Sequence, residues 1–195
     1  MRHLLAASIV VLLLVLATVL SVTGAPDKPL SGRDPADSIS VEVGRVNPWT
    51  SLDVNNKRDA FQFAIVTDRT GGERPGIFAQ AVGKVNLLQP EFVMSVGGLI
   101  QGGSEDPGGW ALEWAEFEAR VAELEMPFFF CAGNHDITYL PMSEEWKRKF
   151  GRTYYDFVYR DVLFIVLNTE EERPGEKVPY RFSTEQQQWV ADVLA

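Results

Sequence analysis

The sequence predicts an α/β fold, because three apolar, strand-like runs each end in a polar loop that contains glycine, and helix-like segments separate them. The three runs span residues 61–66, 91–96 and 127–131. In open α/β sheets the loops beyond the carboxyl ends of the strands surround the ligand-binding crevice. We therefore expect the three loops to converge on one site.

Composition places the chain among globular proteins and excludes one class of partner. Its 195 residues are 46% hydrophobic, which allows one domain with a real core. The formal net charge is −9, with 18 Lys and Arg against 27 Asp and Glu, and no extended cluster of Lys and Arg appears. Because phosphate backbones are bound by clustered cationic side chains, we expect no nucleic-acid partner.

The pattern at the N-terminus is typical of an export segment. Arg2 and His3 precede an apolar run over residues 4–20, and small residues follow up to Ala25. We interpret residues 1–25 as a signal peptide or a signal anchor, with the small residues favouring cleavage. The domain would then be exported, periplasmic or extracellular, and would touch a membrane only through this segment if it stays uncleaved.

Residues 26–57 read as a linker or an irregular lead-in that precedes a domain over residues 58–195. The lead-in is rich in Pro, Asp, Ser and Gly. Within it, the alternation over Ile39–Val43 predicts a short half-buried strand before the turn at Asn47-Pro48-Trp49.

Helices and a hairpin complete the pattern. Apolar residues at helical spacing predict helices between the first and second strands and between the second and third. Ser183, followed three residues later by Gln186, is a helix-start signature. The predicted helices span Gly76–Leu88, Trp110–Glu125, Ser143–Phe150 and 184–195, and the hairpin pairs Tyr154–Tyr159 with Val162–Leu167 around Arg160-Asp161.

Cys131 is the only cysteine, so no intramolecular disulfide can form. It follows Phe128-Phe129-Phe130 and is expected to be a buried strand residue rather than a nucleophile.

Three polar residues at the predicted strand ends could carry chemistry. Asp68 offers a carboxylate, Asn134 a carbonyl oxygen and His135 an imidazole. Such a set suits a divalent cation that activates water, with an imidazolium protonating the leaving oxygen. Taken singly, each residue also has an ordinary structural explanation, as a helix cap, a turn former or a hydrogen-bonded histidine.

The motifs resemble those of a known family. The string Gly133-Asn134-His135-Asp136 after an apolar strand is similar to the Gly-Asn-His-Asp or Gly-Asn-His-Glu motif of calcineurin-like metallophosphoesterases. The segments 66–70 (VTDRT) and 95–102 (SVGGLIQG) stand where that family has its Asp-x-His and Gly-Asp motifs. The resemblance covers roughly residues 58–195. It implies a metallo-dependent phosphatase-like two-sheet sandwich flanked by helices, of which only the N-terminal portion is present, with the strands of this chain forming most of one sheet.

The resemblance also implies roles for the candidate residues. Asp68 would ligate the first of two divalent metal ions (Fe, Mn or Zn). Asn134 would ligate the second metal and bind the substrate phosphate, and His135 would bind substrate and act as general acid. The implied activity is metal-dependent hydrolysis of small-molecule phosphoesters.

Several positions depart from the family pattern. Thr70 replaces the histidine of the first motif, and its hydroxyl could at best hydrogen-bond a metal-bound water. Gly98 replaces the aspartate that bridges both metals, and Gln101 replaces the acid that orients the catalytic histidine. Two divalent cations ~3.5 Å apart repel by about 19 kcal/mol at an effective dielectric constant of ~20, and a bridging anion offsets much of this. Glu105 and Asp106 lie in the same loop, but the sequence does not place them at the site.

The family's further histidine ligands come from strands beyond the region that ends at Ala195, and His3 and His135 are the only histidines here. We therefore expect a fragment of a longer protein with weak or absent turnover. The competing hypothesis is a non-catalytic exported binding module that retains the phosphoesterase fold. A nucleotide-binding loop at residues 97–103 is disfavoured, because the spacing Gly-x-Gly-x-x-Gly is absent.

Overall fold

The computed structural model of the chain describes residues 37–54, 60–171 and 182–195. The predicted export segment at residues 1–25 lies outside the described residues, as do both ends of the lead-in. In the part of the chain that is described, no helix has the length and apolar character needed to cross a membrane.

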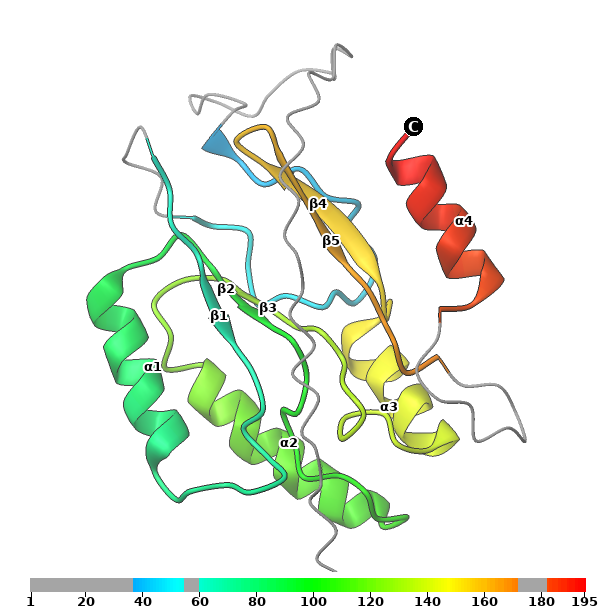
Figure 1. The fold of residues 1–195 in the computed structure, drawn as a ribbon. Helices are drawn as coiled ribbons and strands as arrows, with labels where there is room; N and C mark the ends of the chain where they lie inside the picture. Colours follow the sequence, from blue (N-terminus) through cyan, green and yellow to red (C-terminus); the bar gives the residue numbers. More distant parts are fainter. Residues whose placement is uncertain (1–36, 55–59, 172–181) are drawn as a thin grey trace, which may run out of the picture.

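A three-stranded parallel sheet forms the centre of the fold (Figure 1). Its strands β1 (Ala64–Val66), β2 (Val93–Ser95) and β3 (Phe128–Phe129) lie in the order β1-β2-β3. Each strand lies within one of the three predicted runs; β1 is shorter than its run at the start only, and β2 and β3 are shorter at both ends. Because all three run in the same direction, the loops that follow them leave the same edge of the sheet.

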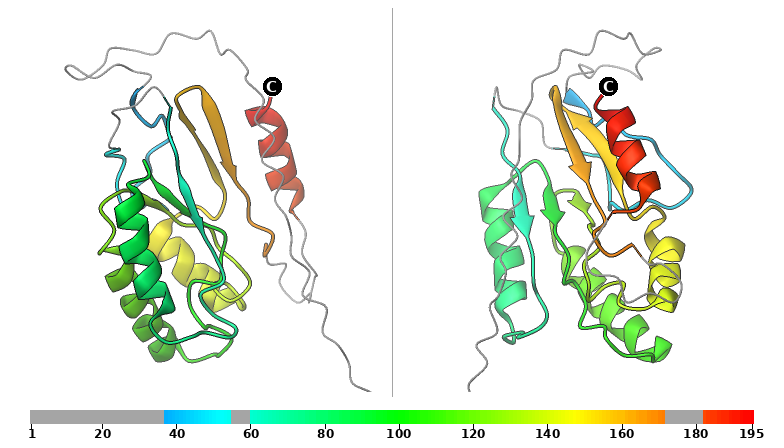
Figure 2. Two further views of the ribbon diagram at one scale, coloured as in Figure 1. Left: turned by 60° about the vertical axis from the view of Figure 1, so that its left-hand side comes forward. Right: turned by 45° about the vertical axis from the view of Figure 1, so that its right-hand side comes forward.

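Three helices cover one face of this sheet (Figures 1 and 2). They are α1 (Ile77–Leu88), α2 (Pro107–Val121) and α3 (Leu140–Phe150). The second helix begins three residues earlier than predicted, because the Asp106 carboxylate accepts hydrogen bonds from the N–H groups of Gly108 and Gly109. The third also begins three residues early, with Pro141 in its first turn, where proline needs no hydrogen-bond partner.

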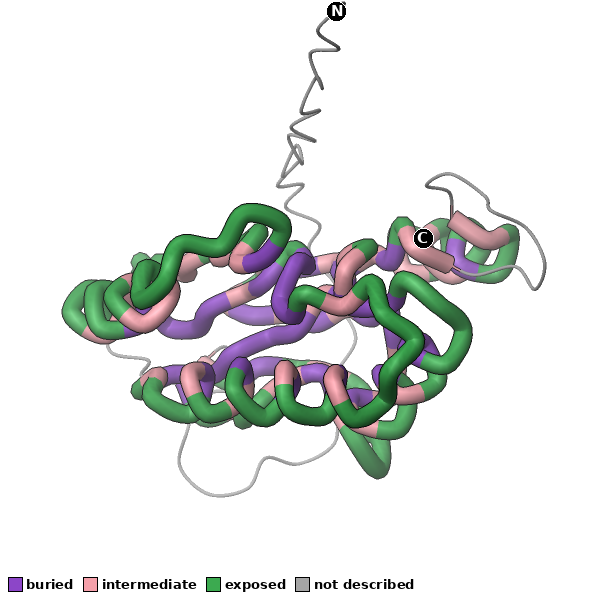
Figure 3. Tube along the Cα trace, turned by 90° about the horizontal axis from the view of Figure 1, so that it is seen from below, coloured by how far each residue is buried: buried purple, intermediate pink, exposed green. Residues whose placement is uncertain are grey.

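Beneath the helices, aromatic and aliphatic side chains pack into a continuous core. In Figure 3 the backbone of the buried residues is purple, and it runs through the middle of the molecule. Trp114 and Phe117 of α2 and Trp146 of α3 are at most 2% exposed. Phe130 stacks on Phe150 with ring centroids 4.5 Å apart. The chain thus buries a sizeable core without any disulfide.

A two-stranded antiparallel sheet, β4 (Tyr155–Tyr159) and β5 (Val162–Val166), packs against the other face. Arg160 and Asp161 form its turn with φ of 48° and 60°, the left-handed pair that suits the twist of a tight hairpin. The expectation that the strands would form most of one sheet is therefore wrong: β1-β2-β3 and β4-β5 belong to two different sheets. The two-sheet sandwich itself is confirmed.

Aromatic rings fill the space between the two sheets. Phe92 lies 5.5 Å from Phe157 and 5.2 Å from Phe164, both edge to face. Phe129 stacks on Phe157 with centroids 4.4 Å apart. The predicted strand at Ile39–Val43 contributes only one bridge to this layer, between Ser40 and Val158, and Ile39 is buried beside it.

The last helix, α4 (Thr184–Val193), lies alongside the hairpin (Figures 1 and 2). Ser183 caps it as predicted, with its hydroxyl oxygen accepting the Gln186 N–H at 3.0 Å. The fully buried Gln186 side chain bonds both backbone groups of Asn168, just beyond β5. Trp189 packs on Tyr154 at 5.0 Å, so α4 is anchored to the second sheet at two points.

Candidate functional site

The loops after β1, β2 and β3 meet at the carboxyl edge of the parallel sheet, as expected. Asp68 N–H donates to Gly97 O at 3.2 Å, and Thr70 N–H donates to Gly98 O at 3.2 Å. A Cβ built on Gly133 would lie 2.8 Å from the Gly97 Cα, so the second and third loops touch through glycine backbones. Asp68 therefore lies on the first loop and Asn134 and His135 lie on the third, and the second loop contacts both.

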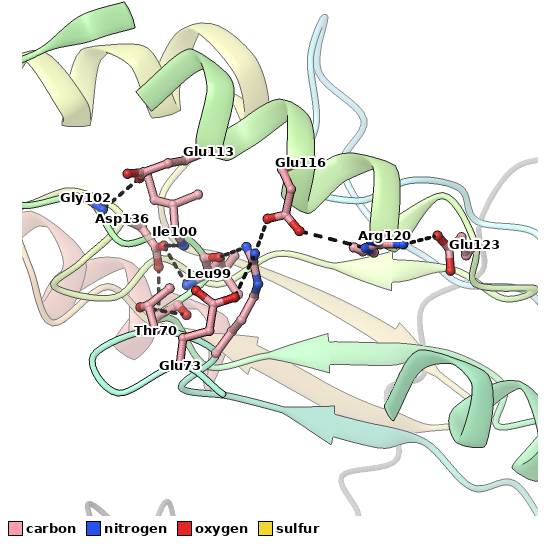
Figure 4. Close-up of polar contacts among 12 residues, drawn as sticks. Thr70, Glu73, Leu99, Ile100, Gly102, Glu113, Glu116, Arg120, Glu123 and Asp136 are labelled. Carbon is pink, nitrogen blue, oxygen red and sulfur yellow. Dashed lines mark hydrogen bonds and ion pairs between the residues drawn. The ribbon is translucent and has the colours of Figure 1, made fainter. Parts of the chain in front are cut away.

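Asp136 joins two of these loops. Its buried carboxylate accepts the N–H groups of four residues at 2.8–3.1 Å, namely Gly98, Leu99, Ile100 and Gly133 (Figure 4 draws the bonds to the second loop). Burial raises the pKa of Asp136 to about 6, and the four donors limit the rise because they stabilise the charged form. Asp136 is the last residue of the Gly-Asn-His-Asp motif, but its role in joining the two loops was not predicted from the sequence.

His135 is held through its Nδ1, which lies 2.7 Å from the backbone oxygen of Gln101. A carbonyl oxygen can only accept, so Nδ1 carries the proton and the neutral ring has its lone pair on Nε2. Nε2 points toward the first loop, where a Cβ built on Gly71 would lie 3.4 Å from it. The family's orienting acid is absent at position 101, but the main chain of that residue provides an acceptor in its place.

The other candidate donors differ in how they are engaged. Thr70 is buried, and its hydroxyl donates to Gly98 O at 3.2 Å. It is therefore directed at the second loop, and its proton is not available to a metal-bound water. Asp68 is exposed and adopts φ 48°, and Asn134 is exposed with its backbone oxygen accepting from Thr138 at 2.6 Å. Asp106 caps α2, which gives it a structural role instead of one at the site.

Position 98 tests whether a two-metal centre fits these loops. Gly98 has φ +68°, and a Cβ built there would lie 3.0 Å from Asp68 Oδ1 and 3.1 Å from its Cα. The backbone has thus closed onto Asp68 where the family places a bridging carboxylate. Among the described residues no three His, Cys, Asp or Glu side chains gather in a way that could hold a metal ion. The donor set does not fit the two-metal centre that the family implies.

Arg69 holds the first loop against the second loop and α2, a role that was not predicted from the sequence. Its guanidinium donates to Leu99 O at 3.0 Å, pairs with Glu116 of α2 and lies 5.7 Å from the ring centres of Phe78 and Phe117 (Figure 4 labels its polar partners Leu99 and Glu116). Beside it is a hollow of about 390 Å³ lined by Arg69, Thr70, Glu73, Gln101, Leu112, Glu113 and Glu116. A larger hollow of about 660 Å³ lies between residues 47–53 and the ends of α2 and α3, away from the three loops. We place the site at the loops, because the candidate chemical groups are there.

The fold and the loops together define an α/β phosphoesterase-like domain with loops converging at the carboxyl edge of a parallel sheet. The chain belongs to the calcineurin-like phosphoesterase family, whose model matches residues 61–190. The family identified from the motifs is thereby confirmed, as is its fold class.

The chain is similar to curated proteins named serine/threonine-protein phosphatase CPPED1. The human protein is 29% identical over 161 residues, which are 79% of this chain and 48% of the relative. The Bos taurus protein is 27% identical over 173 residues, covering 85% and 49% respectively. The chain thus spans about half the length of these relatives. No solved structure gave a significant match.

Proposed function

We propose that this chain carries a phosphoester site of the calcineurin-like type in which His135 is the proton donor and turnover is weak or absent. The proposal rests on one observation: the loops bearing Asp68 and the Asn134-His135 pair are hydrogen-bonded and packed into a single cluster. Family membership and similarity to phosphatases support phosphoesters as the ligand class.

The roles follow from what each group can offer. The exposed Asn134 amide can donate hydrogen bonds to a phosphoryl oxygen. With Nδ1–H engaged by Gln101, Nε2 takes up the second proton when the ring becomes an imidazolium, and from Nε2 His135 can pass that proton to the leaving oxygen. Small-molecule phosphomonoesters or phosphodiesters are the proposed substrates.

Weak turnover is expected because the family's metal chemistry lacks its protein ligands here. A divalent metal supplies activated water in this family. Position 98 has no carboxylate, and the Thr70 hydroxyl is bonded to the Gly98 carbonyl. Without that chemistry, proton donation alone typically contributes only about 10²–10⁴-fold.

A second function is a non-catalytic binding module that retains the fold. The direct bonds from Thr70 to Gly98 favour it, because they close the first and second loops onto each other without a metal. Such a module would bind phosphate esters and release them unchanged.

The test is a phosphatase assay on the purified 195-residue chain. p-Nitrophenyl phosphate and bis-p-nitrophenyl phosphate would be offered with Mn²⁺, Fe²⁺ or Zn²⁺, beside His135→Ala as control. We expect turnover no greater than that of the control. Robust turnover that His135→Ala abolishes would refute the impairment, and robust turnover that survives His135→Ala would refute both the impairment and the assignment of His135. Calorimetric titration with inorganic phosphate, lost in Asn134→Ala, would favour the binding module.

A further inference from the structure

A carboxylate outside all the motifs reaches the loop after β2. Glu113 lies on α2, and its Oε2 accepts the N–H of Gly102 at 2.9 Å (Figure 4). The side chain is partly buried between the helix and the loop. Neither the family pattern nor the helix periodicity gives this residue a role.

The Gly102 N–H belongs to the same peptide group as the Gln101 C=O. That carbonyl accepts the Nδ1–H of His135 at 2.7 Å. Because a peptide group is planar and its N–H and C=O point in opposite directions, an acceptor on one side fixes the direction of the other. Glu113, the 101–102 peptide and His135 thus form one hydrogen-bonded chain.

A charged acceptor on the N–H also strengthens the carbonyl as an acceptor, since hydrogen bonds in series polarise one another. This series of hydrogen bonds therefore places the negative charge of Glu113 one peptide group away from His135, although position 101 bears no acid. Gly102 makes this approach possible. It has φ +53°, and a Cβ there would lie 1.9 Å from the His135 backbone oxygen, so only glycine fits.

The rest of the loop is held independently, because Asp136 accepts the N–H groups of Gly98, Leu99 and Ile100. That carboxylate makes no bond to the 101–102 peptide. Loss of the Glu113 carboxylate should therefore release this one peptide group and leave the loop attached to the third strand.

We propose that Glu113 is a positioning residue that acts through the 101–102 peptide to hold His135 as the Nδ1–H tautomer, leaving Nε2 as the proton-transfer atom. This inference rests on the role of His135 in the proposed function. It identifies the group that replaces the family's orienting acid in this chain.

The test is ¹⁵N NMR of the full chain with labelled histidine, at a pH where the ring is neutral. The chain has two histidines, and the His135 signal is the one absent from a His135→Asn variant. In the wild type we expect Nδ1 to give the protonated signal and Nε2 the unprotonated one. In Glu113→Ala the ratio of the two tautomers should move toward Nε2–H by about tenfold, the effect of losing one charged acceptor.

Matched variants separate positioning from general structural damage. Glu113→Gln keeps an acceptor oxygen and should retain the wild-type tautomer, whereas the shorter Glu113→Asp should behave like Glu113→Ala. Glu118→Ala removes another carboxylate of α2, one paired with Lys149, and should leave His135 unchanged. A wild-type Nε2–H tautomer, or a folded Glu113→Ala that keeps the Nδ1–H tautomer, would overturn the inference.

The NMR result does not depend on substrate. If the tautomer behaves as expected but the chain neither binds phosphate nor turns over esters, the proposed function fails while the positioning stands. If ester turnover requires His135 but the tautomer is Nε2–H, the positioning fails alone.

Discussion

Position 98 shows how a single residue can decide the chemistry of a site. Replacing Gly98 with the aspartate that the family has would require a side chain at φ +68°, pressed against Asp68. We expect Gly98→Asp to bind no more metal than the wild type and to lower the free energy of unfolding by about 1–3 kcal/mol. Elemental analysis and urea unfolding measure the two effects.

Gly76→Asp is the matched control. Gly76 has φ +78°, but a Cβ there meets nothing within 4 Å, so this variant carries the backbone strain without the crowding. Gly98→Asp should be the less stable of the two. If Gly98→Asp instead gained metal without losing stability, the loops would have to open around the new carboxylate. The conclusion that these loops do not fit a two-metal centre would then be wrong.

Cys131 gives a prediction from its pKa. Burial and, to a smaller extent, the nearby Asp136 carboxylate raise the pKa of this thiol from about 9 to about 12. At pH 8 the thiolate fraction therefore falls about a thousandfold relative to an ordinary cysteine. We expect labelling by a thiol-specific disulfide reagent to be correspondingly slow until denaturant is added. Rapid labelling of the native chain would show that the thiol is accessible and ionised, contrary to its expected structural role.

At the scale of the elements, α4 depends on one buried amide. Gln186 accepts the Asn168 N–H and donates to the Asn168 carbonyl, both at 2.9 Å. Gln186→Ala leaves two buried backbone groups without partners, which should lower the free energy of unfolding by about 2–4 kcal/mol. Hydrogen exchange over α4 should rise. Gln188→Ala removes an exposed amide from the same helix and should change stability by no more than about 0.5 kcal/mol. Equal effects of the two changes would contradict the anchoring role.

Local patterns predicted which elements form better than where they begin. The helical spacing over Gly76–Leu88 and the Ser183 cap placed α1 and α4 within one or two residues of their observed bounds. The start of α2 was missed because Asp106 caps it through the flexible pair Gly108-Gly109, which breaks the apolar periodicity. A helix start whose first turn contains glycines therefore carries less signal than an amphipathic face or a Ser cap followed by Gln.

Residues that act across elements carried no local signal at all. Motif spacing found Asp68, Asn134 and His135, because they lie at strand ends. In the sequence Glu113 is one of several acids along an amphipathic helix, and it becomes partly buried and bonds Gly102 only once α2 has packed. The same holds for the partition of strands into two sheets, which depends on ring packing between residues far apart in the chain.

At the scale of the whole molecule, the two sheets are joined through aromatic rings and should unfold together. Phe92 is fully buried and meets Phe157 and Phe164 across the interface. Phe92→Ala should therefore cost about 3–5 kcal/mol and raise hydrogen exchange in β2 and in the hairpin β4-β5 alike. Leu87→Ala, at a side chain 85% exposed, should change stability by no more than about 0.5 kcal/mol. If Phe92→Ala loosened the hairpin while the parallel sheet kept its protection, the sheets would be separate folding units and the three loops could stay assembled without the second sheet.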